Sequence, residues 1–184
     1  MVSMIKRLFF TILILFNIFF VIYLVTPTPS LKLLPNSVLS TLPGDTTQLK
    51  NVTGYYTNLS RTEVINFYLS FYQSPFLIRL NHPPEKSKEI FRDTMQSYYL
   101  EEFIIPFKES LFINGYEWEK DVFTKPEKRI QNKLIYNNIT YRSKINTKII
   151  STSTYTRLSI FFIIQLGVYL IFLCYRRFFS QNAK

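Results

Sequence analysis

The residue types that most often build catalytic and cofactor sites are scarce in this chain of 184 residues. It has a single cysteine, Cys174, so a disulfide within the chain is excluded. Its single histidine, His82, leaves no set of His and Cys ligands for a zinc or iron site. Four glycines leave no glycine-rich loop to cradle a phosphate group. We therefore expect no metal and no cofactor.

Acidic residues are absent from both ends of the sequence, where two long apolar runs stand instead. All 12 Asp and Glu fall within residues 26–157, and the runs at residues 8–25 and 158–175 contain no charge. As a helix, each run is just long enough to cross a hydrocarbon core of roughly 30 Å. The sequence therefore predicts a multi-pass membrane protein with two transmembrane helices and one enclosed domain.

The tails outside the two runs predict the orientation of the chain. They carry five basic residues and no acid: Lys6, Arg7, Arg176, Arg177 and Lys184. Short flanks rich in Lys and Arg stay in the cytoplasm. We expect residues 1–7 and 176–184 to be cytoplasmic at the plasma membrane, and residues 26–157 to be extracytoplasmic. The alternative of a cleaved signal peptide needs small residues at the cleavage site, and alanine occurs only once in the chain, so we expect a retained first span.

Each apolar run contains one strongly polar side chain. Asn17 lies ten residues after Arg7, and Gln165 lies eleven residues before Arg176. Antiparallel helices with both basic ends on one side place the two amides at nearly the same depth. Lipid offers an amide no hydrogen-bond partner, so we expect Asn17 and Gln165 to bond to each other. The alternative is that each amide meets the same residue in a second copy of the protein.

The enclosed segment divides into a linker and a small domain. Four prolines in residues 26–48 break any helix and indicate a linker. Residues 49–157 have the size of an ordinary single domain. We expect an α+β fold in which two transmembrane helices flank a small extracytoplasmic domain with two helices and a β-hairpin.

Local signals place these elements. The sequence Ser60-Arg-Thr-Glu63 fits a capping box and predicts a helix to about residue 73. Pro83-Pro84-Glu85 predicts the start of a second helix, which Pro106 ends or kinks, and Asn114-Gly115 is typical of a stop after one further turn. Residues 131–150 change to a two-residue period around Asn137-Asn138, which predicts the hairpin.

Glu102 is the first candidate functional residue. At helical spacing it falls on an apolar line formed by Phe91, Met95, Tyr98 and Ile105. A carboxylate buried there must be paired, hydrogen-bonded or protonated. One hypothesis is a glycan-cleaving or glycan-modifying enzyme, in which Glu102 is the general acid and the second carboxylate is Glu101, Glu109 or Asp93. We favour a structural role, in which Glu102 forms an ion pair with an arginine such as Arg61, Arg79 or Arg142. Alternatively, a local break in the helix near Pro106 directs Glu102 away from the apolar line.

The hairpin is the second candidate. Pairing around Asn137-Asn138 gathers four basic residues on one face: Lys133, Arg142, Lys144 and Lys148. Like charges directly opposite across a ladder are unfavourable, so an anionic lipid or a phosphate-bearing envelope polymer is a candidate ligand. The alternatives are that these side chains extend into water or pair with carboxylates of the helices.

Three stretches resemble small uncharacterised two-span membrane proteins of candidate-phylum bacteria. They are Tyr55-Tyr-Thr-Asn-Leu-Ser-Arg-Thr-Glu-Val-Ile-Asn-Phe-Tyr68, Tyr99-Leu-Glu-Glu102 and Glu109-Ser-Leu-Phe-Ile-Asn-Gly-Tyr116. The resemblance implies a bacterial plasma membrane and carries no known activity or catalytic residue.

Charge and inventory together favour a function without catalysis. The net charge is +10, but five basic residues lie in the tails, and the enclosed segment holds 17 basic against 12 acidic residues. No basic surface interleaved with stacking aromatics is indicated, so we expect no nucleic acid. We expect a non-enzymatic interaction or structural role at the cell envelope. The expected partners are the lipid bilayer, an anionic lipid or envelope polymer, and a membrane protein.

Overall fold

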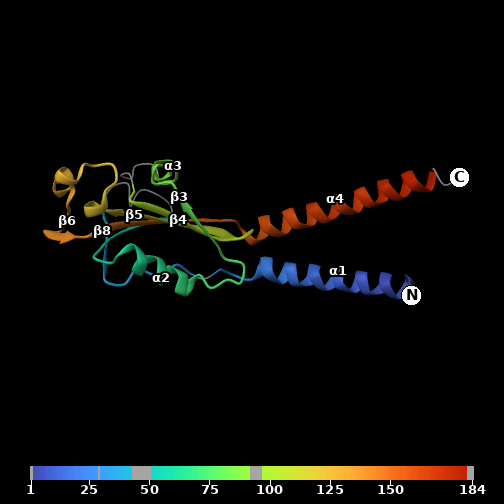
Figure 1. Ribbon diagram of the computed structural model, residues 1–184. Coiled ribbons are helices and arrows are strands. Elements are labelled where there is room, and N and C mark those ends of the chain that lie inside the picture. Colours follow the sequence, from blue (N-terminus) through green and yellow to red (C-terminus); the bar gives the residue numbers. More distant parts are fainter. Residues whose placement is uncertain (1, 29, 43–50, 92–96, 182–184) are drawn as a thin grey trace. The chain divides into compact units, whose positions relative to one another are not determined.

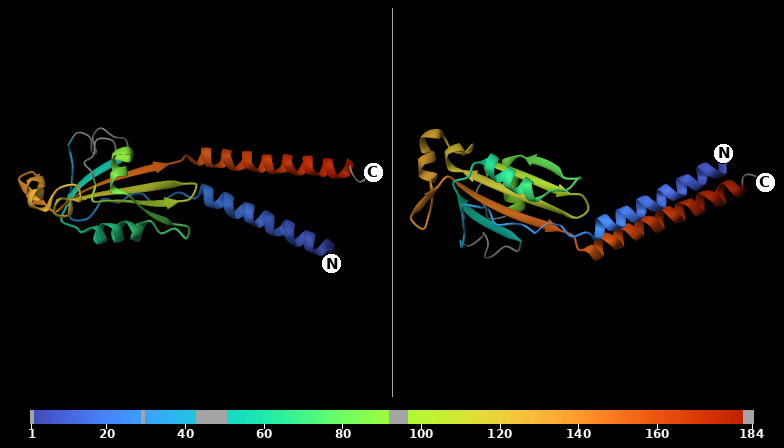
Figure 2. Two further views of the ribbon diagram at one scale, coloured as in Figure 1. Left: turned by 45° about the horizontal axis from the view of Figure 1, so that its top comes forward. Right: turned by 90° about the horizontal axis from the view of Figure 1, so that it is seen from below.

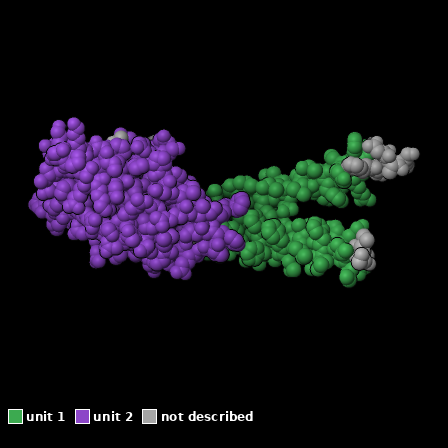
Figure 3. Space-filling view, viewed as in Figure 1, with its two compact units in different colours: residues 1–27, 152–184 green, residues 28–151 purple. Residues whose placement is uncertain are grey.

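The computed structural model describes residues 2–28, 30–42, 51–91 and 97–181. The chain divides into two compact units, one of residues 1–27 and 152–184 and one of residues 28–151 (Figure 3). The first unit consists of two apolar helices, and the second is built on a β-sheet (Figure 1). The expected α+β class with an apolar helix near each end of the chain is confirmed.

The first unit contains α1 (Val2–Val25) and α4 (Thr154–Gln181). Each contains an apolar stretch long enough to cross a membrane, of 22 residues in α1 and 25 residues in α4. Their mean hydropathies are 2.8 and 2.3, and almost all of these side chains are exposed on the protein surface. Burial in a protein core therefore does not account for their apolar character, which fits helices whose surroundings are lipid.

The second unit is a six-stranded antiparallel sheet in the order β1-β2-β8-β5-β4-β3 (Figure 2). Its strands are β1 (Ser37–Leu39), β2 (Val52–Thr57), β3 (Ile78–His82), β4 (Tyr99–Ile105), β5 (Glu109–Glu117) and β8 (Ser143–Ser151). The last strand in the chain, β8, lies in the middle, between β2 and β5. The outermost strands are β1 and β3, so one edge of the sheet is three residues long and the other five.

Helix α2 (Arg61–Phe71) covers one face of the sheet. The expected capping box at its start is confirmed: Ser60 N donates to Glu63 Oε2 at 2.7 Å, and Glu63 N donates to Ser60 Oγ at 3.4 Å. Just beyond the helix, the Tyr72 ring lies 6.4 Å from the ring of Phe103 on β4. The core on this side consists of large buried side chains of α2 and the sheet: Val64, Ile65, Tyr68, Tyr72, Tyr99, Phe103, Leu111, Ile113 and Ile145.

Two smaller clusters cover the other face. Helix α3 (Ser87–Phe91), which follows a 3₁₀ turn at Pro84–Lys86, packs Phe91 against Val52, Leu100 and Phe112. A separate two-stranded sheet of β6 (Leu134–Tyr136) and β7 (Ile139–Tyr141) packs against the sheet through Leu134, Tyr141, Tyr56 and Tyr116. Between β5 and β6 the chain forms two more 3₁₀ turns, Trp118–Lys120 and Pro126–Asn132.

The prediction of a long second helix is wrong, and with it the description of the domain as two helices and a hairpin. In the described part of this segment, the 3₁₀ turn and α3 follow Pro83-Pro84, and the residues around Glu102 form strand β4, which pairs with β3 and β5. Met95 and Asp93 lie outside the described residues. Pro106 begins a turn between two strands, where a proline costs no ladder hydrogen bond.

Asn114-Gly115 is likewise the interior of strand β5 and not a helix end. Gly115 stands opposite Tyr99, and a Cβ at Gly115 would lie 2.1 Å from Tyr99 Cε1. The glycine is therefore explained by the aromatic ring that lies over it and not by a helix C-cap.

The hairpin turn at Asn137-Asn138 is present, with φ of 51° and 62° and the pairing of Tyr136 with Ile139. The strand after the turn is short, however, because the chain leaves the small sheet near Arg142 and enters the large sheet as β8. The segment expected as a linker also joins the large sheet, because its residues 37–39 form β1. Long-range pairing with β2 thus accounts for both differences.

Candidate binding surface at the arginine edge of the sheet

Two arginines converge on one buried carboxylate next to β3. Arg79 Nε and Nη2 donate to the two oxygens of Glu101 at 2.6 and 2.9 Å. Arg61 Nε and Nη2 both donate to Glu101 Oε1, at 3.2 and 2.5 Å. The Glu101 side chain is fully buried, whereas 34% of the Arg61 side chain and 46% of the Arg79 side chain are exposed. We call these three residues the arginine–glutamate cluster.

The register of the sheet and the start of α2 position the cluster. Glu101 on β4 stands opposite Asn81 on β3, and Arg79 is two residues before Asn81. Residues two apart on a strand share a face, so Arg79 and Glu101 are diagonal neighbours on the face that α2 covers. Arg61 is the first residue of α2, and its Nη2 also donates to Asn81 Oδ1 at 3.3 Å. Its guanidinium lies over the Tyr99 ring, 4.9 Å from the ring centroid.

The cluster keeps Glu101 ionised. Burial alone would raise the pKa of the Glu101 carboxyl, but the hydrogen bonds and charges of Arg79 and Arg61 outweigh burial and lower this pKa below its ordinary value. The bonds to Glu101 raise the pKa of Arg79 in turn. Two guanidinium groups and one carboxylate leave the cluster with one net positive charge.

Both guanidinium groups have donors beyond those that Glu101 uses. A guanidinium has five N–H groups, and in the described part of the chain Arg61 and Arg79 donate through Nε and Nη2, with no hydrogen bond from either Nη1. Because both side chains are one-third to one-half exposed, these donors are available to a carboxylate or phosphate from outside.

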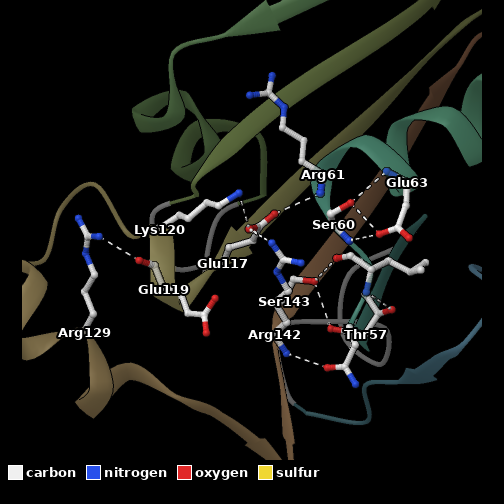
Figure 4. A network of polar contacts seen from close by, with 12 residues as sticks. Thr57, Ser60, Arg61, Glu63, Glu117, Glu119, Lys120, Arg129, Arg142 and Ser143 are labelled. Carbon is white, nitrogen blue, oxygen red and sulfur yellow. Dashed lines mark hydrogen bonds and ion pairs between the residues drawn. The ribbon is translucent and has the colours of Figure 1, made fainter.

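A second buried carboxylate, Glu117, fixes the backbone from which Arg61 extends (Figure 4). Arg61 N donates to Glu117 Oε1 at 3.2 Å, and Lys120 Nζ and Arg142 Nη2 lie 3.3 and 3.7 Å from Glu117 Oε2. A negative charge is favourable at a helix N-terminus, so Glu117 stabilises the first turn of α2 together with Ser60. Glu117 therefore holds the main chain of Arg61, while Glu101 holds its side chain.

The four basic residues predicted as an anion site each have a partner within the domain. These partners are the Trp118 ring for Lys133, the Glu117 carboxylate for Arg142, the Tyr56 ring for Lys144, and the backbone carbonyl of Ile90 for Lys148. Only Lys144 and Lys148 lie on the same strand, β8. Lys148 thus attaches α3 to the large sheet, Arg142 attaches the start of β8 to the end of β5, and the rings of Tyr56 and Trp118 cover the other two cations.

The two carboxylates of the enzyme hypothesis point to opposite faces of the sheet. Glu102 stands opposite Phe112, and Glu109 is three residues before Phe112 on the same strand. Glu102 Oε2 lies 2.7 Å from Nε2 of His82, which ends β3. Glu109 accepts hydrogen bonds at its two oxygens from Tyr72 Oη and Thr28 Oγ1, at 2.6 and 2.7 Å. Of the arginines considered as partners of Glu102, two pair with Glu101 and the third, Arg142, with Glu117.

The two amides of the apolar helices lie together. Gln165 Nε2 donates to Asn17 Oδ1 at 2.8 Å, while Asn17 Nδ2 donates to the Leu13 carbonyl in its own helix. Near the C-terminal end of α1, Arg157 Nη1 donates to the Leu24 carbonyl oxygen at 3.3 Å. Residue numbers rise on α1 as they fall on α4 across these contacts, so the helices are antiparallel.

The arginine–glutamate cluster was not predicted from the sequence, although the sequence contains a signal for it. In a two-residue period, Glu101 shares a face with Tyr99, Phe103 and Ile105, which predicts a buried charge that needs a cation. The helical period instead directed attention to Glu102.

Known proteins add no independent assignment. The chain matches no family model, no curated protein and no solved structure. Within the described ranges, no three His, Cys, Asp or Glu side chains are grouped so as to hold a metal ion.

Proposed function

We propose that this protein is a non-enzymatic interaction module, anchored in the bacterial plasma membrane by α1 and α4. In this proposal, an extended acidic segment of a partner protein adds to the sheet along β3. The observation that carries the proposal is the combination of an open edge strand with the half-exposed arginines beside it.

Strand β3 has the geometry of a docking edge. Among the strands that the structure describes it pairs only with β4, and four of its five residues are exposed. The backbone N–H and C=O groups on the outer side of an edge strand are a template for another strand. The side chains alternate, with Ile78 and Leu80 toward the α3 side and Arg79 and Asn81 toward the α2 side.

The charge of this edge specifies the chemistry of the partner. Arginine forks bind carboxylates in a bidentate manner, and the cluster carries a net positive charge. A segment in which acidic residues alternate with apolar residues matches both sides of β3 at once. Main-chain hydrogen bonds then supply affinity, and the alternate side chains supply selectivity.

The anchoring part of the proposal rests on the apolar helices. Both are long enough to cross a bilayer, and the Asn17–Gln165 bond satisfies polar groups that lipid leaves without partners. The basic tails favour cytoplasmic termini, and in this proposal β3 therefore lies outside the cell. The expectation of a bacterial plasma membrane comes from the sequence resemblance.

The placement of the acidic residues supports a role without catalysis. Glycoside hydrolysis needs two carboxyl groups on either side of one bond, about 5–10 Å apart. Glu102 and Glu109 point to opposite faces of the sheet, and Glu101 is fully engaged by two arginines. Each of these carboxylates joins separate parts of the domain.

A displayed library of random extended peptides tests the docking proposal on the full-length protein in detergent micelles. We expect the wild-type protein to enrich peptides that alternate acidic and apolar residues. Adjacent residues of an antiparallel strand direct their N–H groups to opposite sides. One of the two variants Leu80→Pro and Asn81→Pro therefore removes an outward donor and leaves the β3–β4 ladder intact, whereas the other removes a donor of the ladder. The proline variant that keeps the wild-type unfolding temperature should lose the enrichment.

Two further variants make the peptide test decisive. Leu39→Pro on β1, at the opposite edge of the sheet, is the matched control. Ser40 N donates to the Gly54 carbonyl on β2, so the N–H of the adjacent Leu39 points outward, and this variant should retain the enrichment. Arg79→Lys keeps the charge but not the forked geometry, so we expect weaker selection for acidic residues. Enrichment that is absent, or that persists unchanged in both β3 proline variants, contradicts docking at β3.

Orientation is tested separately in intact cells. Cys174→Ser removes the only thiol, and Lys88→Cys introduces one at an exposed position of α3. Labelling by a membrane-impermeant thiol reagent without lysis is expected. Labelling only after lysis would place the domain in the cytoplasm and refute the extracytoplasmic part of the proposal.

A further inference from the structure

Exposed apolar side chains gather at one end of the sheet. On the α3 side of the sheet, a transverse row runs from Ile78 through Ile104 and Ser110 to Ile150, each paired with the next. Ile78 and Ile150, at the two ends of the row, are about half exposed. Phe76, two residues before Ile78, is also exposed. The docking edge described above uses only Ile78 from this group.

The turn between β4 and β5 adds the most exposed aromatic ring of the domain at the same end. Phe107 in this turn is 67% exposed, and its φ is 64°. A left-handed backbone is unfavourable for a bulky residue, and the other described non-glycine residues with positive φ are all asparagine: Asn36, Asn51, Asn137 and Asn138. A bulky phenylalanine thus occupies a backbone position that favours Asn or Gly, and two-thirds of its surface is open to the surroundings of the domain.

This end of the sheet is also where the chain enters and leaves the domain. Glu109, two residues after Phe107, pairs with Ser151 at the end of β8 and accepts a hydrogen bond from Thr28. Three Cα steps separate Ser151 from Thr154, where α4 begins, and three separate Thr28 from Val25, where α1 ends. At about 3.5 Å per residue, neither connection is longer than about 11 Å.

We propose that this end of the sheet contacts the lipid headgroup region, and that Phe107 inserts its ring at the boundary between headgroups and acyl chains. The inference rests on the proposed membrane anchoring, because the short connections then keep Thr28 and Ser151 near the bilayer surface. Aromatic side chains are favoured at this depth, where an apolar ring leaves water without entering the hydrocarbon centre. The row from Ile78 to Ile150 then faces the same surface, so the bilayer is the occupant of this apolar patch.

Tryptophan fluorescence in vesicles tests the contact with the full-length chain. The native Trp118 follows β5 at the opposite end from Glu109 and is first replaced by Phe. In that background, Phe107→Trp is compared with Ile135→Trp, which is matched in exposure at 64% but lies in the small sheet. Phe162→Trp in α4 reports on insertion of the anchor itself. The vesicles contain phosphatidylcholine with or without bromine on the acyl chains, because bromine quenches nearby tryptophan.

We expect bromination to quench the Phe107→Trp protein several-fold more than the Ile135→Trp protein, with a blue-shifted emission maximum in the former. Quenching of Phe162→Trp without quenching of Phe107→Trp would leave the anchor intact and refute the surface contact. Absence of quenching in Phe162→Trp would refute the membrane anchoring on which the inference rests. Equal quenching of Phe107→Trp and Ile135→Trp would show that the whole domain meets lipid and would also refute a contact specific to this end.

Discussion

Replacing Glu101 by Gln should destabilise the domain far more than the same change at Glu102. Glu101 accepts four hydrogen bonds from Arg61 and Arg79, and its side chain has no exposure to solvent. Glu101→Gln removes the charge that both guanidinium groups share and places an amide N–H₂ group against cations. Removing one partner of a buried ion pair costs about 3–5 kcal/mol of stability. Because both arginines are partly exposed and regain some hydration, we expect the lower end, about 3 kcal/mol.

Glu102→Gln is the matched control, since it removes the same charge one residue along β4. Glu102 forms a hydrogen bond with the His82 ring, and a glutamine still offers that ring a hydrogen-bond partner. We expect a loss of about 1 kcal/mol or less. Thermal unfolding of the purified full-length proteins, followed by near-ultraviolet circular dichroism, measures both changes. For a domain of this size, 3 kcal/mol lowers the unfolding temperature by about 10 °C.

A second substitution tests whether an unpaired charge is the cause. In the Glu101→Gln background, Arg79→Gln removes one of the two cations left without an anion, so it should restore part of the lost stability. In the wild-type background the same change leaves Glu101 with one arginine and should be destabilising. Equal losses for Glu101→Gln and Glu102→Gln, or no recovery on adding Arg79→Gln, would refute the assignment of Glu101 as the carboxylate that holds the cluster together.

Three further outcomes follow from other contacts. Because the folded-state pKa of Glu101 is lowered, its stabilisation is fully present above the unfolded value of about 4.3 and is lost as pH falls through the folded value; acid titration of unfolding should show this loss below about pH 4, and Glu101→Gln should flatten it. Gly115→Ala would place a Cβ 2.1 Å from the buried Tyr99 ring, so denaturant unfolding should show a loss of about 1–3 kcal/mol of stability. The additional loss that Gly115→Ala causes in a Tyr99→Ala background should be much smaller. Asn17→Leu and Gln165→Leu should be non-additive by about 0.6–2 kcal/mol in unfolding measured in micelles, and additive effects would contradict the interhelical bond.

The features predicted correctly from the sequence are those that short segments determine by themselves. The two apolar helices follow from uncharged runs, the start of α2 from the Ser60 and Glu63 capping box, and the turn after Tyr136 from two asparagines. Each depends on residues within a few positions of one another. In these elements the local preference of the sequence agrees with the long-range contacts of the fold.

The segment around Glu102 shows why the rest was beyond local reasoning. Its apolar residues fit both a helical period, with Glu102 on the apolar line, and a strand period, with Glu101 on the buried face. Pairing with β3 and β5 decides between the two. Strand β5 follows β4 after a short turn, but Leu80, the partner of Glu102 on β3, lies 22 positions earlier in the sequence. The arginine–glutamate cluster depends on the same pairing, because Arg61 reaches Glu101 across 40 positions of the sequence.

Adjacent residues of a strand lie on opposite faces of the sheet, and this alternation constrains any partner at β3. On β4, Glu101 directs its charge to the α2 side, where the arginines are, while Glu102 points to the other side. The edge strand repeats the division, with Arg79 on the α2 side and Leu80 on the α3 side. A partner strand that is shifted by one residue would set its acidic side chains against Leu80 and its apolar ones against Arg79. If a partner strand docks as proposed, the edge would therefore select its register as well as its composition, which a surface of scattered charges would not do.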